Sequence, residues 1–168
     1  MEPAVKPACL HTRSGVVGVL ATERSLDGEL FRRTAARYGR GIEVVTAPGK
    51  GFVELVESDR EATPEAEECV RRAMAGMLER GADQIVLGCT HYPFLMPVFE
   101  RIVAGRDVTI IDPSPAVARR TAQLLDQYGL RAAPDHRPTY EFRTFADEAY
   151  RERLRAKAFA DADTPAAR

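Results

Sequence analysis

The chain has 168 residues, a length that suits one domain, and its 24 lysine and arginine residues nearly balance 25 aspartate and glutamate residues. This balance provides no positive field for nucleic acid or an anionic membrane surface, so a small molecule is the expected partner. No apolar run approaches the roughly 20 residues of a membrane span, and the N-terminus lacks a signal-peptide pattern, so we expect a cytoplasmic protein. The three cysteines, Cys9, Cys69 and Cys89, show no disulfide spacing and are expected to be free thiols.

The first part of the chain alternates short apolar runs with helical periodicity. Residues 16–20 predict a buried strand, residues 26–39 a helix and residues 42–45 a second strand. The glycine-containing loop that follows is not a phosphate-binding loop, because Lys50 is followed by Gly51 where a P-loop has Ser or Thr. Residues 52–57 then form a short apolar turn with two carboxylates.

The clearest helix start in the sequence is at Thr63-Pro64. Threonine is a good N-cap, proline is favoured at the first helical position, and acidic residues follow in the first turn. The buried stripe of this helix is predicted to contain Val70, Met74, Met77 and Leu78. Cys69 adjoins the stripe, and we interpret it as a packing residue.

The second part of the chain continues the alternation. Residues 94–103 predict a helix, residues 108–111 a fourth strand, residues 114–127 a helix with one apolar face, residues 139–145 a strand and residues 147–159 a last helix. Alternating strands and helices predict an α/β fold with a parallel sheet and right-handed crossovers.

The third strand leads into the most informative stretch, Gln84–Leu95. Residues 85–87 suit a buried strand, Gly88 permits a sharp bend, and Pro93 suits the first position of a helix. The polar residues between Gly88 and Pro93 are therefore expected at the carboxyl end of a strand. Ligands bind at that edge in open parallel sheets.

These polar residues are Cys89, Thr90 and His91. A cysteine beside a helix N-terminus is favoured in its thiolate form, and a histidine two residues away can relay the proton. The simpler interpretation is a buried cysteine and a hydrogen-bonded histidine in a turn.

The stretch Gly88-Cys89-Thr90-His91-Tyr92-Pro93 resembles the signature around the second catalytic cysteine of the cofactor-independent glutamate racemases, members of the aspartate/glutamate racemase family. Four other stretches are similar to the same family in the same order: residues 3–8, 18–22, 52–57, and 111–112 followed by 116–120. The resemblance covers nearly the whole chain.

The resemblance implies racemisation of glutamate, in which one thiol removes the Cα proton on one face and a second thiol returns a proton on the other. It implies a supply of D-glutamate for peptidoglycan, with no metal, pyridoxal or nicotinamide cofactor. Cys89 resembles one acid/base thiol, His91 the histidine that supports it, and Thr90 a residue that binds polar groups of the substrate. Glu57 resembles the auxiliary acid of the Leu-Val-Glu motif, and Glu54 stays open as the alternative carboxylate.

Two motifs of the family do not occur in the sequence. Family members carry an Asp-Ser-Gly motif and the other cysteine in a Cys-Asn-Thr motif, both upstream of the first matching stretch; Cys9 is not beside Asn-Thr. We expect the chain to correspond to the C-terminal part of a racemase. The implied organisation is an interlobe segment (1–15), a complete lobe (16–112), C-terminal elements that belong to the other lobe (113–160) and a tail (161–168).

This organisation predicts a stable core over residues 16–111 and no racemase turnover by the chain alone. The C-terminal third is expected to be loosely docked, oligomerised through its apolar face or disordered, because its apolar side chains lack their partner surface. The side chains expected wholly or partly in water are Val117, Leu124, Leu125, Tyr140, Phe142, Phe145 and Leu154.

Other functions stay open. The chain can be a non-catalytic remnant or a binding module, or it can belong to a related aspartate or hydantoin racemase. Zinc binding by the Cys-x-His pairs at residues 9–11 and 89–91 is a weaker alternative, because their spacing is not a known zinc pattern.

Overall fold

The computed structural model describes residues 2–159, without the side chains of residues 2, 3 and 30. The predicted tail at 161–168 lies outside the described residues. The chain divides into two compact units, Met1–Gly129 and Leu130–Arg168. The helices and strands of the first unit are α1 (Glu2–His11), β1 (Val16–Ala21), α2 (Glu23–Leu26), α3 (Glu29–Tyr38), β2 (Glu43–Pro48), α4 (Phe52–Glu57), α5 (Pro64–Glu79), β3 (Gln84–Leu87), the 3₁₀-helix η1 (Tyr92–Leu95), α6 (Met96–Val103), β4 (Thr109–Ile111) and α7 (Ser114–Gln127). The second unit contains α8 (Glu148–Phe159).

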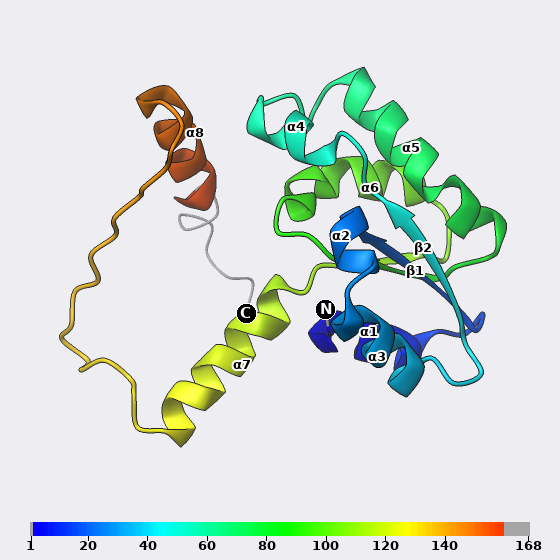
Figure 1. The fold of residues 1–168 in the computed structure, drawn as a ribbon, viewed down its shortest axis with the longest axis horizontal. Helices are drawn as coiled ribbons and strands as arrows, with labels where there is room; N and C mark the ends of the chain where they lie inside the picture. The colour runs from blue at the N-terminus through cyan, green and yellow to red at the C-terminus, as the bar shows by residue number, and fades with distance from the viewer. Residues whose placement is uncertain (1, 160–168) are drawn as a thin grey trace. The chain divides into compact units, whose positions relative to one another are not determined.

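The first unit is built on a four-stranded sheet in the order β2-β1-β3-β4 (Figure 1). All neighbouring strands are parallel, with Val17 opposite both Val44 and Gln84, and Val86 opposite Ile111. The prediction of an α/β fold with a parallel sheet is therefore confirmed. Because the strands are parallel, their carboxyl ends all lie at the same edge of the sheet.

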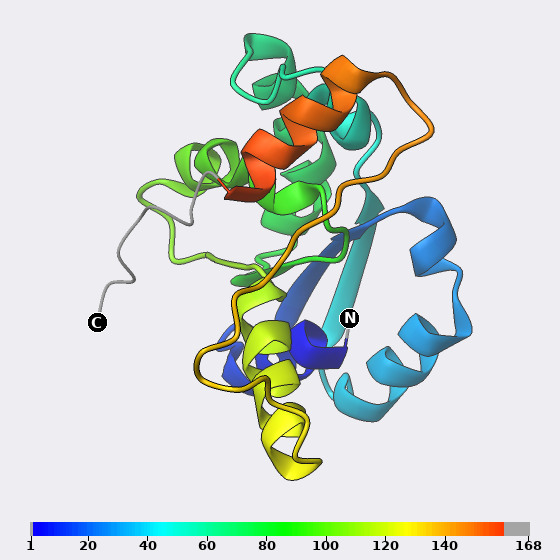
Figure 2. The same cartoon turned by 90° about the vertical axis from the view of Figure 1, so that its left-hand side faces the viewer.

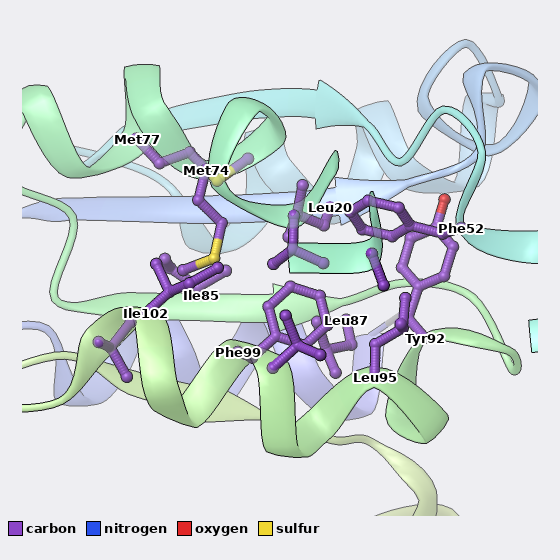
Figure 3. Close-up of a cluster of buried hydrophobic side chains, with 14 of the residues drawn as sticks. Leu20, Phe52, Met74, Met77, Ile85, Leu87, Tyr92, Leu95, Phe99 and Ile102 are labelled. Carbon is purple, nitrogen blue, oxygen red and sulfur yellow. The ribbon is translucent and has the colours of Figure 1, made fainter. Parts of the chain in front are cut away.

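Helices cover both faces of this sheet, with α4, α5 and α6 on one face and α1 and α3 on the other (Figures 1 and 2). Alternate residues of a strand point to opposite faces. Leu20 and Leu87 accordingly pack with Phe52, Met74 and Phe99 on the first face (Figure 3). On the other face the buried cluster contains Val17, Val19 and Val86 from the strands and Ala4, Val5, Ala8 and Phe31 from the helices.

Helix α5 begins as the sequence predicts. The Thr63 side chain accepts a hydrogen bond from the Ala66 N–H at 3.3 Å, and Pro64 follows in the first turn. The helix buries Ala66, Val70, Met74 and Met77, whereas Leu78 is half-buried. Close packing of this helix depends on a glycine in β1, because a Cβ added to Gly18 would lie 2.6 Å from the Met77 sulfur.

Helix α1 was not predicted, because residues 2–11 show no clear periodicity and Pro7 lies inside the helix. Proline in a helix interior removes a backbone hydrogen bond. Burial compensates, since Ala4, Val5 and Ala8 are fully buried against the sheet. Tertiary packing therefore overrides the local preference.

The turn after α1 is held by Asp83, which precedes β3. Its carboxylate accepts hydrogen bonds from the Thr12 hydroxyl and the Arg13 N–H, both at 2.6 Å, and from the Ser14 N–H at 3.0 Å. Burial by itself raises the pKa of Asp83, but these hydrogen bonds outweigh burial and lower the pKa of Asp83 below its ordinary value of 3.8. Asp83 thus connects the start of β1 to the start of β3.

Four predicted elements differ from the structure. Residues 52–57 form the helix α4 rather than a turn, and the helix predicted at 26–39 begins only at Glu29. Residues 139–145 form no strand, because a strand needs a neighbour to pair with and none of the described segments pairs with them. The helix predicted at 94–103 is preceded by the 3₁₀-helix η1, so the α-helix begins only at Met96.

The second unit is stabilised locally by aromatic contacts. The rings of Tyr140 and Phe142 meet Phe159 of α8 edge-to-face, with centroid distances of 5.0 and 5.7 Å. Tyr140 is 65% exposed and Phe145 is fully exposed, whereas Phe142 and Leu154 are half-buried.

In the first unit, Val117 of α7 is 47% exposed and Leu124 and Leu125 are half-buried. Together with the side chains of the second unit, these residues confirm the expectation that the seven apolar side chains lie wholly or partly in water.

None of the described helices combines the length and the apolar character that a membrane-spanning helix needs.

Candidate active site

The turn after β3 lies at the carboxyl edge of the sheet. The Gly88 N–H donates to the Leu20 carbonyl at 2.6 Å, which extends the pairing of β3 with β1 by one residue. The chain then leaves the sheet, and the Tyr92 N–H donates to the Cys89 carbonyl at 3.2 Å. The structure therefore places a half-buried Cys89 and an exposed Thr90 at the position that the sequence predicts.

Cys89 is the first member of a line of three polar side chains. Its sulfur lies 4.0 Å from Nδ1 of His91, and Nε2 of His91 lies 3.2 Å from Oε1 of Glu57. Glu57 is the last residue of α4 and reaches the turn from a different part of the chain. The His91 and Glu57 side chains are 28% and 38% exposed, so both are reachable by water and by a small molecule.

This line distinguishes the two carboxylates that the sequence left open. Glu57 lies within hydrogen-bonding distance of His91, whereas Glu54 is exposed and lines a neighbouring pocket with Lys50 and Tyr92. A carboxylate next to a histidine orients the imidazole and stabilises its protonated form. Glu57 is thus the carboxylate that can support proton transfer between the histidine and the thiol.

A pocket of about 430 Å³ opens beside the cysteine. It is lined by Cys89 and Thr90 from the turn after β3 and by Ser114 and Val117 from the first turn of α7. The start of α7 is fixed by Asp112, whose Oδ1 accepts hydrogen bonds from the Ser114 N–H at 2.8 Å and from the Ser114 hydroxyl at 2.7 Å. The pocket is therefore formed by two segments that follow neighbouring strands, β3 and β4.

Tyr92, the residue after His91, packs beneath the thiol turn, and no pattern in the sequence indicated this role. It is fully buried, and its ring meets Phe52 edge-to-face at 5.0 Å. Burial, reinforced by negative charge on Cys89 and Glu54 and opposed by the hydrogen bond to Gly49, raises the pKa of Tyr92 to about 12. A Cβ added to Gly49 would lie 2.5 Å from the Tyr92 hydroxyl oxygen, so the loop after β2 contacts this ring closely.

The other cysteines lie away from this site. Cys9 is buried in the cluster on the opposite face of the sheet, where burial raises the pKa of its thiol. Cys69 lies on α5 and lines a separate pocket beside β2. The pairs Cys9-x-His11 and Cys89-x-His91 are not brought together, and residues 2–159 contain no group of three or more His, Cys, Asp or Glu side chains that could hold a metal ion.

Comparison with known proteins adds a family context. The family profile described as Asp/Glu/Hydantoin racemase matches residues 1–121. The glutamate racemase of Herpetosiphon aurantiacus is 41% identical over 155 residues, which cover 92% of this chain and 61% of the relative. Other matching glutamate racemases are covered over 47% and 50% of their length, so the chain spans about half the length of several curated relatives.

Solved structures show the same fold. A glutamate racemase from Bacillus anthracis superimposes with a TM-score of 0.80 at 23% identity, covering 95% of this chain and 59% of that one. A second match is the Escherichia coli glutamate racemase, solved with L-glutamate and the activator UDP-MurNAc-ala. It has a TM-score of 0.69 at 28% identity, and the match covers 91% of this chain and 56% of the Escherichia coli chain.

Proposed function

Because this chain belongs to the Asp/Glu/Hydantoin racemase family, we propose that it contributes one of two acid/base thiols to the racemisation of glutamate. The family resemblance of the five sequence stretches is confirmed by the family match. The observation that carries the proposal is the line from Glu57 through His91 to Cys89 at the carboxyl edge of the sheet.

The proposed chemistry follows from the order of these side chains. The Cys89 thiolate removes the Cα proton of the amino acid and becomes a thiol, and in the reverse direction the thiol returns the proton. His91 takes up or supplies the proton that the sulfur exchanges between turnovers. Glu57 orients the imidazole through its contact with Nε2, and Thr90 offers a hydroxyl to a polar group of the substrate.

Racemisation needs a second acid/base group, because a proton must be returned to the face opposite to the one from which it was removed. In residues 2–159 only one cysteine lies at this pocket. We therefore expect no turnover by the chain alone and expect turnover when a polypeptide that carries the complementary thiol is present.

The proposed substrate is glutamate, supported by the names of the relatives and by the L-glutamate bound to the Escherichia coli enzyme. Aspartate stays the alternative, since the family description includes aspartate and hydantoin racemases. We place the reaction in the cytoplasm without a cofactor, supplying D-glutamate for peptidoglycan.

The experiment measures deuterium incorporation at Cα of glutamate and aspartate in D₂O. The full chain is assayed alone and with the separately produced N-terminal part of the Herpetosiphon aurantiacus racemase. Exchange is expected only in the mixture and is expected to disappear in Cys89→Ser, while Cys69→Ser serves as the matched control. Undiminished exchange with Cys89→Ser would contradict the proposal, and glutamate binding without any exchange would instead indicate a non-catalytic binding module.

A further inference from the structure

The pocket beside Cys89 has a wall that the proposed chemistry does not use. Ser114, Val117 and Ala118 lie three and four positions apart, which places them on one face of α7. All three line the same pocket as Cys89. The start of this helix is held by the two hydrogen bonds from Ser114 to Asp112, so the wall has a defined position.

The side chains around this pocket are uncharged. They come from Leu87, Cys89, Thr90, Pro113, Val117 and Ala118, together with Gly88 and Ser114. Two carboxyl side chains lie next to residues of this site: Asp112 accepts from the Ser114 N–H, and Glu57 lies 3.2 Å from His91. A carboxylate of a ligand inside this pocket would therefore lose water without gaining a cation, which is unfavourable.

We propose that Val117 is a specificity-determining residue, which admits a narrow, uncharged part of the ligand beside the Cys89 thiol and disfavours an anionic group there. This inference rests on the proposed function only in taking Cys89 as the reacting thiol. It deepens that function by assigning the carboxylates of an amino-acid substrate to groups outside this pocket. Val117 is 47% exposed, so its side chain can be changed without disturbing a buried core.

A matched pair of reagents tests the charge preference. Iodoacetamide and iodoacetate have nearly the same size and react alike, with a sulfur–carbon bond formed and iodide released, but only iodoacetate is anionic. In the full chain, mass spectrometry should show Cys89 reacting faster with iodoacetamide, by a ratio larger than that of free cysteine. Val117→Lys should lower this ratio by roughly fivefold, because it places a cation beside the thiol.

The control for that charge is Gln127→Lys at the other end of α7. Ten residues of helix separate it from Val117 by about 15 Å, which exceeds the Debye length of about 8 Å at physiological salt. The ratio in this variant should equal that of the unmodified protein. An equal change in both variants, or no change in Val117→Lys, would overturn the proposal.

A second pair of variants tests the shape of the wall. Val117→Trp should slow the reaction of Cys89 with N-ethylmaleimide several-fold and affect iodoacetamide less, because the larger reagent needs more of the pocket. Thr121→Trp, one turn further along the helix and outside the pocket, should leave both rates unchanged. Unchanged melting temperatures would show that the variants fold.

The outcomes separate this inference from the proposed function. If Cys89 reacts but its rates are the same in both Val117 variants as in the unmodified protein, the inference is wrong and the racemase proposal is unaffected. The expected Val117 effects combined with no deuterium exchange in the reconstituted mixture would sink the racemase proposal only. If Cys89 reacts with none of the three reagents in the folded protein, the pocket is not open to small molecules. That result would also overturn the inference.

Discussion

Helices α5 and α7 have similar lengths, and each has a proline in its first turn and one apolar face. Their surroundings differ: α5 buries Ala66, Val70, Met74 and Met77 against the sheet, whereas no residue of α7 is buried within the described part of the chain. An apolar stripe on a helix therefore stabilises the fold only where a neighbouring surface packs against it. In α7 the first turn instead borders the pocket of the thiol.

The difference in local stability should be largest in limited proteolysis. We expect trypsin to cut after Arg119 and Arg120 of α7 well before it cuts after Arg71 and Arg72 of α5, because cleavage requires local opening and α7 lacks buried contacts. All four arginines are exposed residues in helices, so the pairs are matched. Mass spectrometry of the early fragments gives the order in which the two arginine pairs are cut. Simultaneous cleavage at both pairs would mean that α7 opens no more readily than α5.

Truncation of one apolar side chain in each helix sharpens the comparison. Met74→Ala should lower the free energy of unfolding by about 2–5 kcal/mol, because it leaves a cavity beneath the sheet. Leu124→Ala, at a half-buried position of α7, should cost less than about 1 kcal/mol. Urea denaturation followed by circular dichroism measures both. Equal losses would show that α7 packs against a surface as extensive as that of α5.

Removal of the Asp83 charge tests a link within the sheet unit. Asp83→Asn should cost about 1–3 kcal/mol at neutral pH, because an NH2 group replaces one of the two charged oxygens that accept the part-buried hydrogen bonds from Thr12, Arg13 and Ser14. The pKa of Asp83 is lowered in the folded protein, so its stabilisation is present above the ordinary value of 3.8 and is lost as the pH falls through the folded value. The difference between the two proteins should therefore shrink on acidification below that value.

Urea denaturation midpoints of both proteins, measured between pH 7 and pH 3, give this difference in stability. Its pH dependence should follow the linkage between folding and protonation of Asp83. Asp107→Asn is the control, since Asp107 forms an exposed ion pair with Arg13 in which the side chains of Asp107 and Arg13 are 82% and 69% exposed. Such a pair contributes little to stability. A pH-independent deficit in Asp83→Asn would argue against the charged hydrogen bonds as its cause.

Removal of a helix N-cap should have the smallest effect on the free energy of unfolding. Thr63→Ala should cost about 1 kcal/mol, because the Ala66 N–H loses its acceptor. The start of α7 has Pro113 in the equivalent position, which forms no side-chain cap. As a control, Thr121→Ala in α7 should change the free energy by no more than about 0.5 kcal/mol. Thermal melts at equal protein concentration resolve the two, and identical shifts would remove the cap as an explanation.

Features that depend on neighbouring residues were predictable from the sequence. The Thr63-Pro64 start, the strand at residues 84–87 and the turn that carries Cys89 are encoded by short-range patterns, and the structure places all three as predicted. The parallel sheet followed as well, because strands that alternate with helices can pair in few other ways.

Features that depend on long-range contacts needed the tertiary structure. Sequence pattern could not choose between Glu54 and Glu57, because the choice rests on which side chain reaches His91 across the fold. It missed α1, whose stability comes from burial of Ala4, Val5 and Ala8 on the sheet rather than from local preference. It also predicted a strand at residues 139–145, where the residue types suit a strand but no described neighbour pairs with it.

The sequence by itself determined the α/β alternation, the parallel sheet and the position of Cys89, Thr90 and His91 at a strand end, because periodicity and turn chemistry act over a few residues. Only the tertiary structure decided that Glu57 lies within hydrogen-bonding distance of His91 and that Val117 and Cys89 line the same pocket. Those pairs come from distant parts of the chain. Their meeting depends on how helices pack around the sheet, which no local pattern encodes.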